Sequence, residues 1–279
     1  MEISESYGFV HRRFYGKKVI VFAPHQDDAE FYAGGTLAKM IAEDDKVVIV
    51  VATDGSKGSF EHAGDALAAL RRSEALQAAK VLGAEPPIML GYRDFELDKL
   101  PAGQLREQFI HLIRQQQPDV VFAEDAFANG EVHPDHRAVA WAASDAINYA
   151  TLPLLHPEHL AQGVDPHFVV EKYFFSDDLA DANKVVDISD TFERKIAALT
   201  EHKSQIKFLV EGILNEARLA GVDLAGLLGA AASNHLMAFT WAMQTQAAGV
   251  GQKAGFTYGE AFRYVRFHPF VENILTTQS

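Results

Sequence analysis

Four side chains able to bind a metal or move a proton crowd into six positions near the start of the chain. In the stretch "VIVFAPHQDDAEFYAGGTL" (19–37) they are His25, Asp27, Asp28 and Glu30. Adjacent carboxylates repel each other and lose solvation at the edge of a core, so water or a bound cation must offset that cost. Neutral imidazole and carboxylate are good zinc ligands, and two such residues from one turn supply half of a tetrahedral shell. The remaining aspartate stands near the metal without binding it, where a general base is expected.

Two other interpretations of this stretch stay open at this point. Acidic residues after a strand also cap helices, and a glycine pair before a helix occurs in nucleotide-binding turns. Gly34 and Gly35 do not form G-x-G-x-x-G. The four polar side chains before them would also repel a phosphate, which disfavours dinucleotide binding.

A second polar cluster follows another predicted strand. In "VVFAEDAFANGEVHPDHRAVA" the strand at 120–123 is followed by a loop, and "HPDH" opens the next helix. His133 and His136 lie three positions apart, Pro134 fixes the turn between them, and Asp135 is either a helix N-cap or part of the site. Ligands of open parallel sheets bind at the carboxyl ends of the strands, so we expect this pair near the first cluster. The similar "HPEH" at 156–159 follows a helix, and we interpret it as a surface turn.

The segments around the clusters alternate between strand and helix patterns. Strands are predicted at 17–24, 46–55, 87–94 and 118–125, and helices at 34–45, 64–83, 105–117 and 136–150. The nearly continuous apolar run at 46–55 is typical of a strand buried on both faces. Short connections between alternating strands and helices predict an α/β fold with a doubly wound, mostly parallel, Rossmann-like sheet.

After about residue 150 the alternation becomes less regular. Strands are predicted at 172–177, 183–189 and 258–268, and Asp190 with Glu193 resembles a capping box that opens a helix at 191–205. We find no linker or repeat, and therefore predict a single domain over 1–279, with a core at about 17–190 and a C-terminal elaboration at about 191–279. We interpret the uncharged tract 224–252 as a buried helix, a lid or the subunit interface of a homo-oligomer. The sequence does not decide between these alternatives.

The composition limits both partners and metal ligands. Lys and Arg number 25 and Asp and Glu 38, which leaves a net charge of −13 and argues against nonspecific binding to nucleic acid or anionic membranes. Cysteine is absent, so a metal site must use His, Asp or Glu. The first residues lack the apolar segment of a signal peptide, and 224–252 is too polar for a membrane span, so we expect a cytoplasmic protein.

Together the two clusters resemble the PIG-L, or LmbE-like, zinc-dependent de-N-acetylases. The shared motifs are "PHQDDAE", "TDG", "RRSEA", "LGYRD" and "HPDHRAV", in this order over about residues 17–150, with weaker echoes in "KSQ" and "YGEAF". The combination of H-x-D-D with H-P-D-H is much more specific than either half. Many members have glutamate directly after the aspartate pair, where this chain has Ala29 and then Glu30, which puts a supporting role of Glu30 in doubt.

The resemblance implies a metal site with named ligands. Zinc would be held by His25, Asp28 and His136 with an open position for water, and Asp27 would be the general base. Fe²⁺ is the other candidate metal.

The resemblance also implies the remaining site residues. His133, protonated, would stabilise the tetrahedral intermediate, and Asp135 would orient its imidazole. Arg71 is similar to the sugar-binding arginine of the family, and Asp94 and Tyr258 would line the pocket.

The implied activity is hydrolysis of the acetyl amide of an N-acetylated amino sugar or its conjugate, a small-molecule substrate. Zinc lowers the pKa of a bound water from about 15.7 towards about 7, and Asp27 would carry the proton from that water to the departing nitrogen. Three alternatives stay open. These are an amidase that cleaves a larger sugar or thiol conjugate, a non-catalytic sugar-binding module, and a non-haem iron oxygenase with the same ligand types.

Overall fold

The structure, a computed structural model, describes residues 16–177, 180–224, 226, 229 and 234–277. A seven-stranded sheet runs through these residues in the order β3-β2-β1-β4-β5-β7-β6. The strands are β1 Lys18–Ala23, β2 Lys46–Thr53, β3 Ile88–Tyr92, β4 Val120–Glu124, β5 Glu171–Phe175, β6 Lys184–Asp187 and β7 Gly259–Val265. Strands β1 to β5 pair in parallel, and β7 is antiparallel to both β5 and β6. The predicted α/β fold with a mostly parallel sheet is therefore confirmed.

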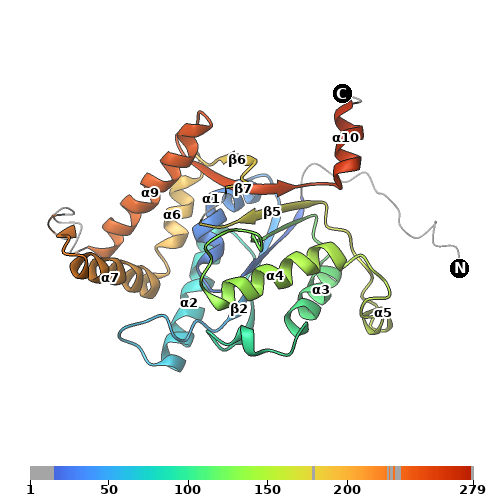
Figure 1. Cartoon of the computed structure of the whole chain (residues 1–279), viewed down its shortest axis with the longest axis horizontal. Coiled ribbons are helices and arrows are strands. Elements are labelled where there is room, and N and C mark those ends of the chain that lie inside the picture. The colour runs from blue at the N-terminus through green and yellow to red at the C-terminus, as the bar shows by residue number, and fades with distance from the viewer. Residues whose placement is uncertain (1–15, 178–179, 225, 227–228, 230–233, 278–279) are drawn as a thin grey trace, which may run out of the picture.

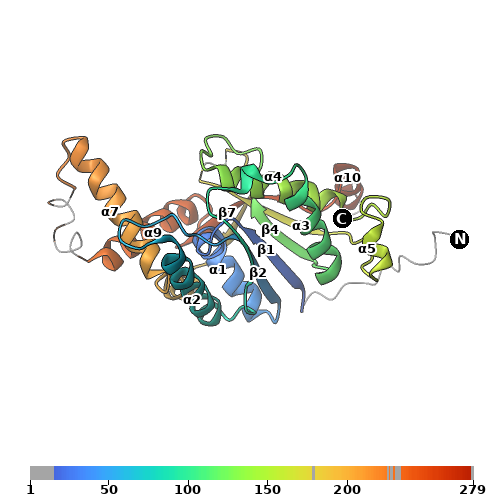
Figure 2. The same cartoon turned by 90° about the horizontal axis from the view of Figure 1, so that it is seen from below.

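Helices cover both faces of the sheet (Figures 1 and 2). One face carries α3 Gln104–Gln116 and α4 Pro134–Tyr149, and the other carries α1 Asp28–Ala42, α2 Gly64–Leu82 and α6 Phe192–Leu199. Along β1, Ile20 and Phe22 pack with α3 and α4, whereas Val19 and Val21 pack with α1. Successive side chains of a strand point to opposite faces, so burial on both faces requires the uninterrupted apolar run seen in the sequence.

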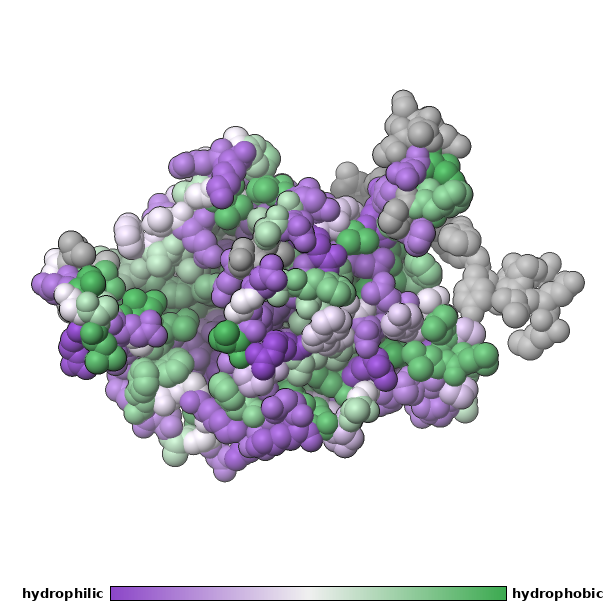
Figure 3. Space-filling model, in the orientation of Figure 1, coloured by the Kyte–Doolittle hydropathy of each residue, from purple (hydrophilic) through white to green (hydrophobic). Residues whose placement is uncertain are grey.

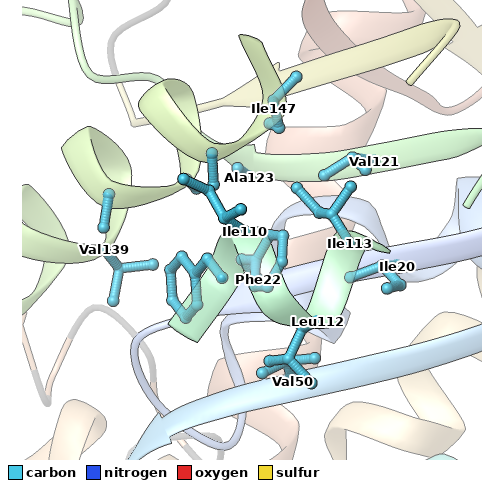
Figure 4. Close-up of a cluster of buried hydrophobic side chains, with 14 of the residues drawn as sticks. Ile20, Phe22, Val50, Ile110, Leu112, Ile113, Val121, Ala123, Val139 and Ile147 are labelled. Carbon is cyan, nitrogen blue, oxygen red and sulfur yellow. The ribbon is translucent and has the colours of Figure 1, made fainter. Parts of the chain in front are cut away.

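The core on the α3–α4 side includes α4, the helix that begins at the second polar cluster of the sequence. Phe22 of β1 and Phe109 of α3 stack with their ring centroids 4.2 Å apart. Figure 4 shows Ile110 and Ile113 of α3 and Val139 of α4 gathered against the strands. This packing fixes α4 relative to β1 and β4, and so places its first turn at the carboxyl ends of these strands.

The helix α1 begins earlier than predicted. The predicted helix at 34–45 begins with the glycine pair, but α1 starts at Asp28, and Gly34 and Gly35 lie inside it. A Cβ atom on Gly35 would lie only 2.7 Å from Ile188, and one on Gly34 would lie 3.0 Å from Lys195. The two glycines therefore permit close packing of the C-terminal residues on α1, rather than a turn before it.

The predicted helix at 191–205 is two helices, and its predicted capping box is wrong. Helix α6 ends at Leu199, and α7 Lys203–Leu219 follows after a short break that contains His202. The N-cap of α6 is Thr191 rather than Asp190, and its side chain makes no capping hydrogen bond. Its hydroxyl donates instead to the carbonyl of Gly35 in α1, at 2.8 Å.

The C-terminal helices form a third hydrophobic cluster beside the sheet. Helices α6 and α7 pack there with α9 His235–Lys253, and α7 and α9 project from the molecule in Figure 1. The predicted tract 224–252 is therefore partly helical, while 225, 227–228 and 230–233 lie outside the described residues. The remaining elements are η1 Leu97–Lys99, α5 Glu158–Ala161 and α10 Pro269–Thr277. None of the helices described is both long and apolar enough to cross a membrane.

Hydrophilic and hydrophobic residues are interspersed over the face seen in Figure 3. Helices α7 and α9 together form the projecting arm. Its exposed apolar side chains include Ile213 and Leu219 of α7 and Trp241 of α9. Of the three interpretations of the tract 224–252, the buried helix holds only for one side of α9, which buries Phe239 and Met243, and the lid and the subunit interface stay predictions.

Candidate active site

The two polar clusters meet at the carboxyl ends of β1 and β4, which are adjacent parallel strands. His25 follows β1 by two residues, and Asp28 is the first residue of α1. His136 lies in the first turn of α4, after the loop that follows β4. Residues 111 positions apart are thereby brought side by side, because each belongs to the turn that leaves the same edge of the sheet.

The three predicted metal ligands form a compact triangle. The Nδ1 atom of His25 lies 3.2 Å from Nε2 of His136 and 3.5 Å from Oδ2 of Asp28, and the latter two atoms are 3.8 Å apart. In a tetrahedral zinc site with bonds of about 2.1 Å, neighbouring ligand atoms lie about 3.4 Å apart. One cation can therefore be shared by all three side chains.

The other nitrogen of each histidine faces a carboxylate. Nε2 of His25 lies 3.1 Å from Oδ1 of Asp94, and Nδ1 of His136 lies 3.0 Å from Oε2 of Glu124. Carboxylates in these positions fix the ring tautomers and direct the remaining lone pairs of both histidines at each other. Only a proton or a cation between the two nitrogens makes this arrangement favourable, so the donor set fits a metal.

A second group of candidate ligands surrounds the far side of His25, but its oxygens are already engaged. Asp135 accepts hydrogen bonds from the backbone amides of Phe95, at 2.6 Å, and Leu97, at 3.1 Å. Asp94 contacts His25 with one oxygen and accepts from a backbone amide with the other. These carboxylates position the loop after β3 and the ring of His25, and we do not assign them a metal.

Neighbouring charges and hydrogen bonds shift the pKa values of all three residues of the triangle. Burial would raise the pKa of Asp28, but the charges of His136 and His25 and hydrogen bonds from His25 hold it well below its usual range. Burial would lower the pKa of His136, but Asp28 and Glu124 raise it to about 9. Burial also opposes the charge of His25, and hydrogen bonds with three aspartates raise its pKa well above the ordinary value. The carboxylates around the triangle therefore favour positive charge at its two histidines.

Asp27 is held by the arginine that was predicted to bind sugar. Arg71 is only 3% exposed, and its Nη2 donates to Oδ1 of Asp27 at 2.7 Å while its Nη1 donates to the carbonyl of Gly55. Among the described residues, no hydrogen bond reaches the second carboxylate oxygen of Asp27. Arg71 thus acts on Asp27 in this structure rather than lining an open pocket, and it leaves Asp27 one oxygen for proton transfer.

His133 is oriented by a main-chain group, which differs from the predicted contact. Its Nδ1 accepts a hydrogen bond from the backbone N–H of Asp135 at 3.2 Å, so the proton of the neutral ring is on Nε2. Burial, together with the charges of His25 and His136, lowers the pKa of His133 to about 4. The expected imidazolium is therefore replaced by a neutral hydrogen-bond donor at neutral pH.

The two other predicted pocket residues have structural contacts. Asp94 is 2% exposed and supports His25, as described above. The ring of Tyr258 stacks on Phe192 at 4.1 Å, and its hydroxyl accepts a hydrogen bond from Gln244. Tyr258 thus belongs to the third hydrophobic cluster, and its described contacts do not include the residues of the triangle.

The second histidine pair lies in a surface turn in which Pro157 and Glu158 are exposed, but one of its histidines is buried. His159 is 1% exposed, and its ring nitrogens contact Arg114 at 3.1 Å and Glu107 at 2.9 Å. Arg114 is fully buried and also donates to the carbonyl of His156. The burial of His159 could not be predicted, because α3, which supplies Arg114 and Glu107, precedes the pair by some forty residues. We therefore assign the positive charge among these histidines and carboxylates to the guanidinium of Arg114, and not to a metal ion.

Sequence reasoning assigned no role in the site to three buried ionisable residues near the triangle. Glu124 ends β4, and burial raises its pKa to about 8. Burial also raises the pKa of Glu30 to about 8, and Oε2 of Glu30 lies 3.8 Å from Nε2 of His202. Glu124 had a usable signal, since a carboxylate directly after a buried parallel strand points to the active edge. His202 had none, because it lies between two helices that the sequence pattern merges.

Comparison with known proteins gives consistent similarities. Residues 20–147 match the PIG-L family, described as GlcNAc-PI de-N-acetylase. The diacetylchitobiose deacetylase of Thermococcus kodakarensis is 34% identical over 191 residues, or 68% of this chain and 70% of that protein. A probable N-acetyl-alpha-D-glucosaminyl L-malate deacetylase 2 of Bacillus anthracis is 28% identical over 49% of this chain and 61% of its own length. The structure of N,N'-diacetylchitobiose deacetylase from Pyrococcus horikoshii with its inhibitor MPG has a TM-score of 0.73 and 30% identity, and covers 92% of this chain and 88% of that chain.

Proposed function

Because the chain belongs to the PIG-L family of de-N-acetylases, we propose that it hydrolyses the acetyl amide of an N-acetylated amino sugar, releasing acetate and a free amine. The names of the relatives describe deacetylation of diacetylchitobiose and of an N-acetylglucosaminyl malate, which supports this substrate class. The observation that carries the proposal is the triangle of His25, Asp28 and His136 with Asp27 beside it.

We assign the metal as zinc, held by His25, Asp28 and His136. Two imidazoles and one carboxylate leave the open position that catalytic zinc sites keep, although Fe²⁺ accepts the same ligand types. When bound there, zinc would lower the pKa of a coordinated water towards about 7 and polarise the acetyl carbonyl. Metal analysis of the purified protein, followed by reconstitution with each metal, tests this assignment.

The side chains of the site divide the proton transfers between them. Asp27, with one oxygen held by Arg71, accepts a proton from the attacking water while the new C–O bond forms. Nε2–H of His133 donates to the carbonyl oxygen as that oxygen gains negative charge. Asp27 then delivers its proton to the amide nitrogen while the C–N bond breaks. This transfer makes the leaving group a neutral amine instead of an amine anion.

The activity is tested with a panel of substrates. Zinc-loaded protein is incubated with N-acetylglucosamine, N,N'-diacetylchitobiose and a larger N-acylated sugar conjugate, and released amine is measured. Amine release from the conjugate alone favours the amidase alternative. Sugar binding without amine release, and with equal affinity in Asp27→Ala, favours the binding-module alternative.

Loss of the general base is expected to remove activity but not the metal. Asp27→Ala should lower kcat by about 10²- to 10⁴-fold, because a positioned general base contributes a factor of that order. Zinc content measured by elemental analysis should stay at the wild-type value. Undiminished amine release by this variant, or by the chelated wild type, contradicts the mechanism.

The two histidines at the start of α4 are expected to separate metal binding from rate. His136→Ala should lose zinc stoichiometry because it removes one of three ligands. His133→Ala should keep zinc and lose about 10²- to 10³-fold in kcat, the usual effect of removing one donor to a developing oxyanion. Zinc content and kcat measured on both variants decide the assignment, which fails if both keep the full rate.

The single domain and the cytoplasmic location stay predictions from the sequence. The small-molecule nature of the substrate rests on the same family argument as the activity. The proposal therefore concerns the reaction at the triangle and not the assembly of the protein.

A further inference from the structure

Phe95, in the segment between β3 and η1, has a backbone conformation that side chains rarely adopt. Its φ is +61°, in the left-handed region, where a residue with a bulky side chain is an outlier. Such strain persists only where the surroundings enforce it, and it concentrates at functional sites. The question is therefore what the position of this ring provides.

The backbone on both sides of Phe95 is clamped by hydrogen bonds. The N–H of Phe95 donates to Oδ2 of Asp135 at 2.6 Å, and the N–H of Leu97 donates to Oδ1 of the same carboxylate at 3.1 Å. On the other side, the N–H of Asp94 donates to Asp54 at 3.1 Å. The conformation is thus imposed by Asp135 and Asp54, and Asp135 also lies beside His25, with its Oδ2 3.7 Å from Nε2 of that ring.

The left-handed conformation of Phe95 does not bury its side chain in the hydrophobic core. Phe95 is 47% exposed, whereas Leu97, two residues later, is buried in the core on the α3–α4 side. The Phe95 ring lies with its centroid 4.2 Å from that of His133, at an interplanar angle of 55°. A large apolar ring is therefore held in solvent beside the residue that is proposed to donate to the substrate carbonyl.

The chemistry of the substrate brings its sugar to the same place. In an N-acetylated pyranose, the acetyl carbonyl carbon and the ring carbon are joined through one nitrogen, a distance of about 2.4 Å. If the carbonyl oxygen contacts His133, the pyranose must lie next to the side chains around His133. A pyranose has an apolar face of C–H groups that packs well on an aromatic ring, and aromatic side chains commonly line ligand sites.

We propose that Phe95 is the platform on which the pyranose ring of the substrate packs, so that it determines specificity for cyclic N-acetyl sugars. The inference rests on the proposed function, and it adds a residue that binds the sugar rather than the acetyl group. The chain carries a net charge of −13, but the Phe95 ring is neutral and apolar, and it therefore matches the uncharged C–H face of a pyranose. Because the platform contacts the sugar before and during reaction, it contributes uniform binding and changes KM rather than kcat.

The test compares Phe95→Leu with Phe168→Leu. Phe168 is also exposed, at 60%, but precedes β5 and so lies at the opposite edge of the sheet. Phe95→Leu should raise KM for N,N'-diacetylchitobiose about three- to tenfold with kcat within about twofold, and Phe95→Trp should restore KM. Phe168→Leu should leave both constants unchanged. Unchanged KM in Phe95→Leu, or an equal change in the control, overturns the proposal.

Two further measurements separate sugar binding from a purely structural role. Phe95→Asn places a residue that tolerates positive φ at this position, so its Tm should equal or exceed that of the wild type while KM rises. A lower Tm would mean that the ring stabilises the fold, and it overturns the proposal. If the ring only shields His133, the pH profile of kcat should shift in Phe95→Leu at constant KM, which also contradicts it.

Failure of the two proposals gives different results. If the wild type releases no amine from any N-acetyl sugar, the proposed function fails. The platform is then still tested by the dissociation constant of N,N'-diacetylchitobiose for the zinc-loaded protein with and without Phe95→Leu. If the wild type is active and both KM and this dissociation constant are equal in the variant, only the role of Phe95 fails.

Discussion

At the scale of single residues, the proposed metal site depends on carboxylates that are not among its proposed ligands. Asp94 and Glu124 each face the nitrogen of a ligand histidine that points away from the triangle. Such partners fix the ring orientation and raise the basicity of the ligand, and their loss typically weakens metal binding about 10- to 100-fold.

Removal of the charge behind His136 is therefore expected to weaken zinc binding. Glu124→Gln keeps the size of the side chain and should raise the dissociation constant of zinc about 10- to 100-fold. Competition with a chromogenic chelator measures this constant. Glu107→Gln is the matched control, since Glu107 also contacts a histidine, His159, but away from the triangle. Equal affinities in wild type and Glu124→Gln contradict the role of Glu124.

The pH dependence of metal binding follows from the raised pKa values of the two ligand histidines. The pKa of His136 is about 9 and that of His25 lies well above its ordinary value, so at neutral pH zinc must displace their protons. Affinity should therefore rise with pH up to about pH 9, about tenfold per unit for each proton displaced. Calorimetric titrations in buffers of different ionisation enthalpy count the released protons. An affinity that does not change between pH 6 and 9 contradicts this expectation.

At the scale of elements, α1 is tied to the C-terminal elaboration in the middle of the helix. Glu260 of β7 accepts hydrogen bonds from the N–H groups of Gly35, at 2.9 Å, and Thr36, at 2.8 Å. Lys195 of α6 donates to the carbonyl of Phe31, at 2.7 Å, and pairs with Glu260 at 2.6 Å. A buried ion pair thus bonds to backbone groups in the middle of α1, and it connects this helix, whose first residue is Asp28, to α6 and β7.

Breaking this buried pair is expected to destabilise the protein strongly. Glu260→Gln leaves the Lys195 ammonium buried without a counter-charge and should lower the free energy of unfolding by about 3–5 kcal/mol. Adding Lys195→Met should recover part of the loss, because the unpaired charge is removed. Urea unfolding followed by circular dichroism measures both variants.

An exposed ion pair provides the control. Glu61 and Lys207 form a salt bridge with exposed side chains, so Glu61→Gln should change the free energy of unfolding by less than about 1 kcal/mol. A loss as small as this in Glu260→Gln would show that the buried pair is not a structural connection.

At the scale of the whole molecule, the C-terminal elaboration is part of the central sheet. Strand β7 lies between β5 and β6, and its Phe262 is buried in the core that also contains Phe122 of β4. The region after residue 190 therefore completes the same layers that hold the site, instead of folding on them as an addition.

Deletion of the elaboration is expected to prevent cooperative folding. A chain that ends at residue 190 lacks β7 and α6, and exposes the side of α1 and the part of the core that pack against them. It should lose its near-ultraviolet circular dichroism and its sigmoidal unfolding transition. Deletion of 269–279 alone removes α10, which is not part of the sheet, and should leave both signals in place. A cooperative transition in the longer deletion would instead show an independent core domain at about 17–190.

The sequence by itself determined the layers of this protein and the identity of its reactive residues. Strands buried on both faces require continuous apolar runs, and helices between them require amphipathic segments, so the order of elements could be predicted from local patterns. The active edge also followed, because β1 and β4 end in polar clusters and parallel strands end on the same side. The gathering of both clusters at this edge could be predicted for this reason, and the choice of His25, Asp28 and His136 as ligands came from the family resemblance.

Only the tertiary structure decided what each polar side chain contacts. The hydrogen bond from Arg71 to Asp27, the contact of Asp94 with His25 and the pairing of Glu260 with α1 join residues 44, 69 and about 225 positions apart. No local pattern encodes such contacts, because periodicity places a residue on a face of its own element but not opposite a particular partner. The sequence therefore named the reactive groups, and the packing of β3, α2, α6 and β7 around them decided which of these groups act on each other.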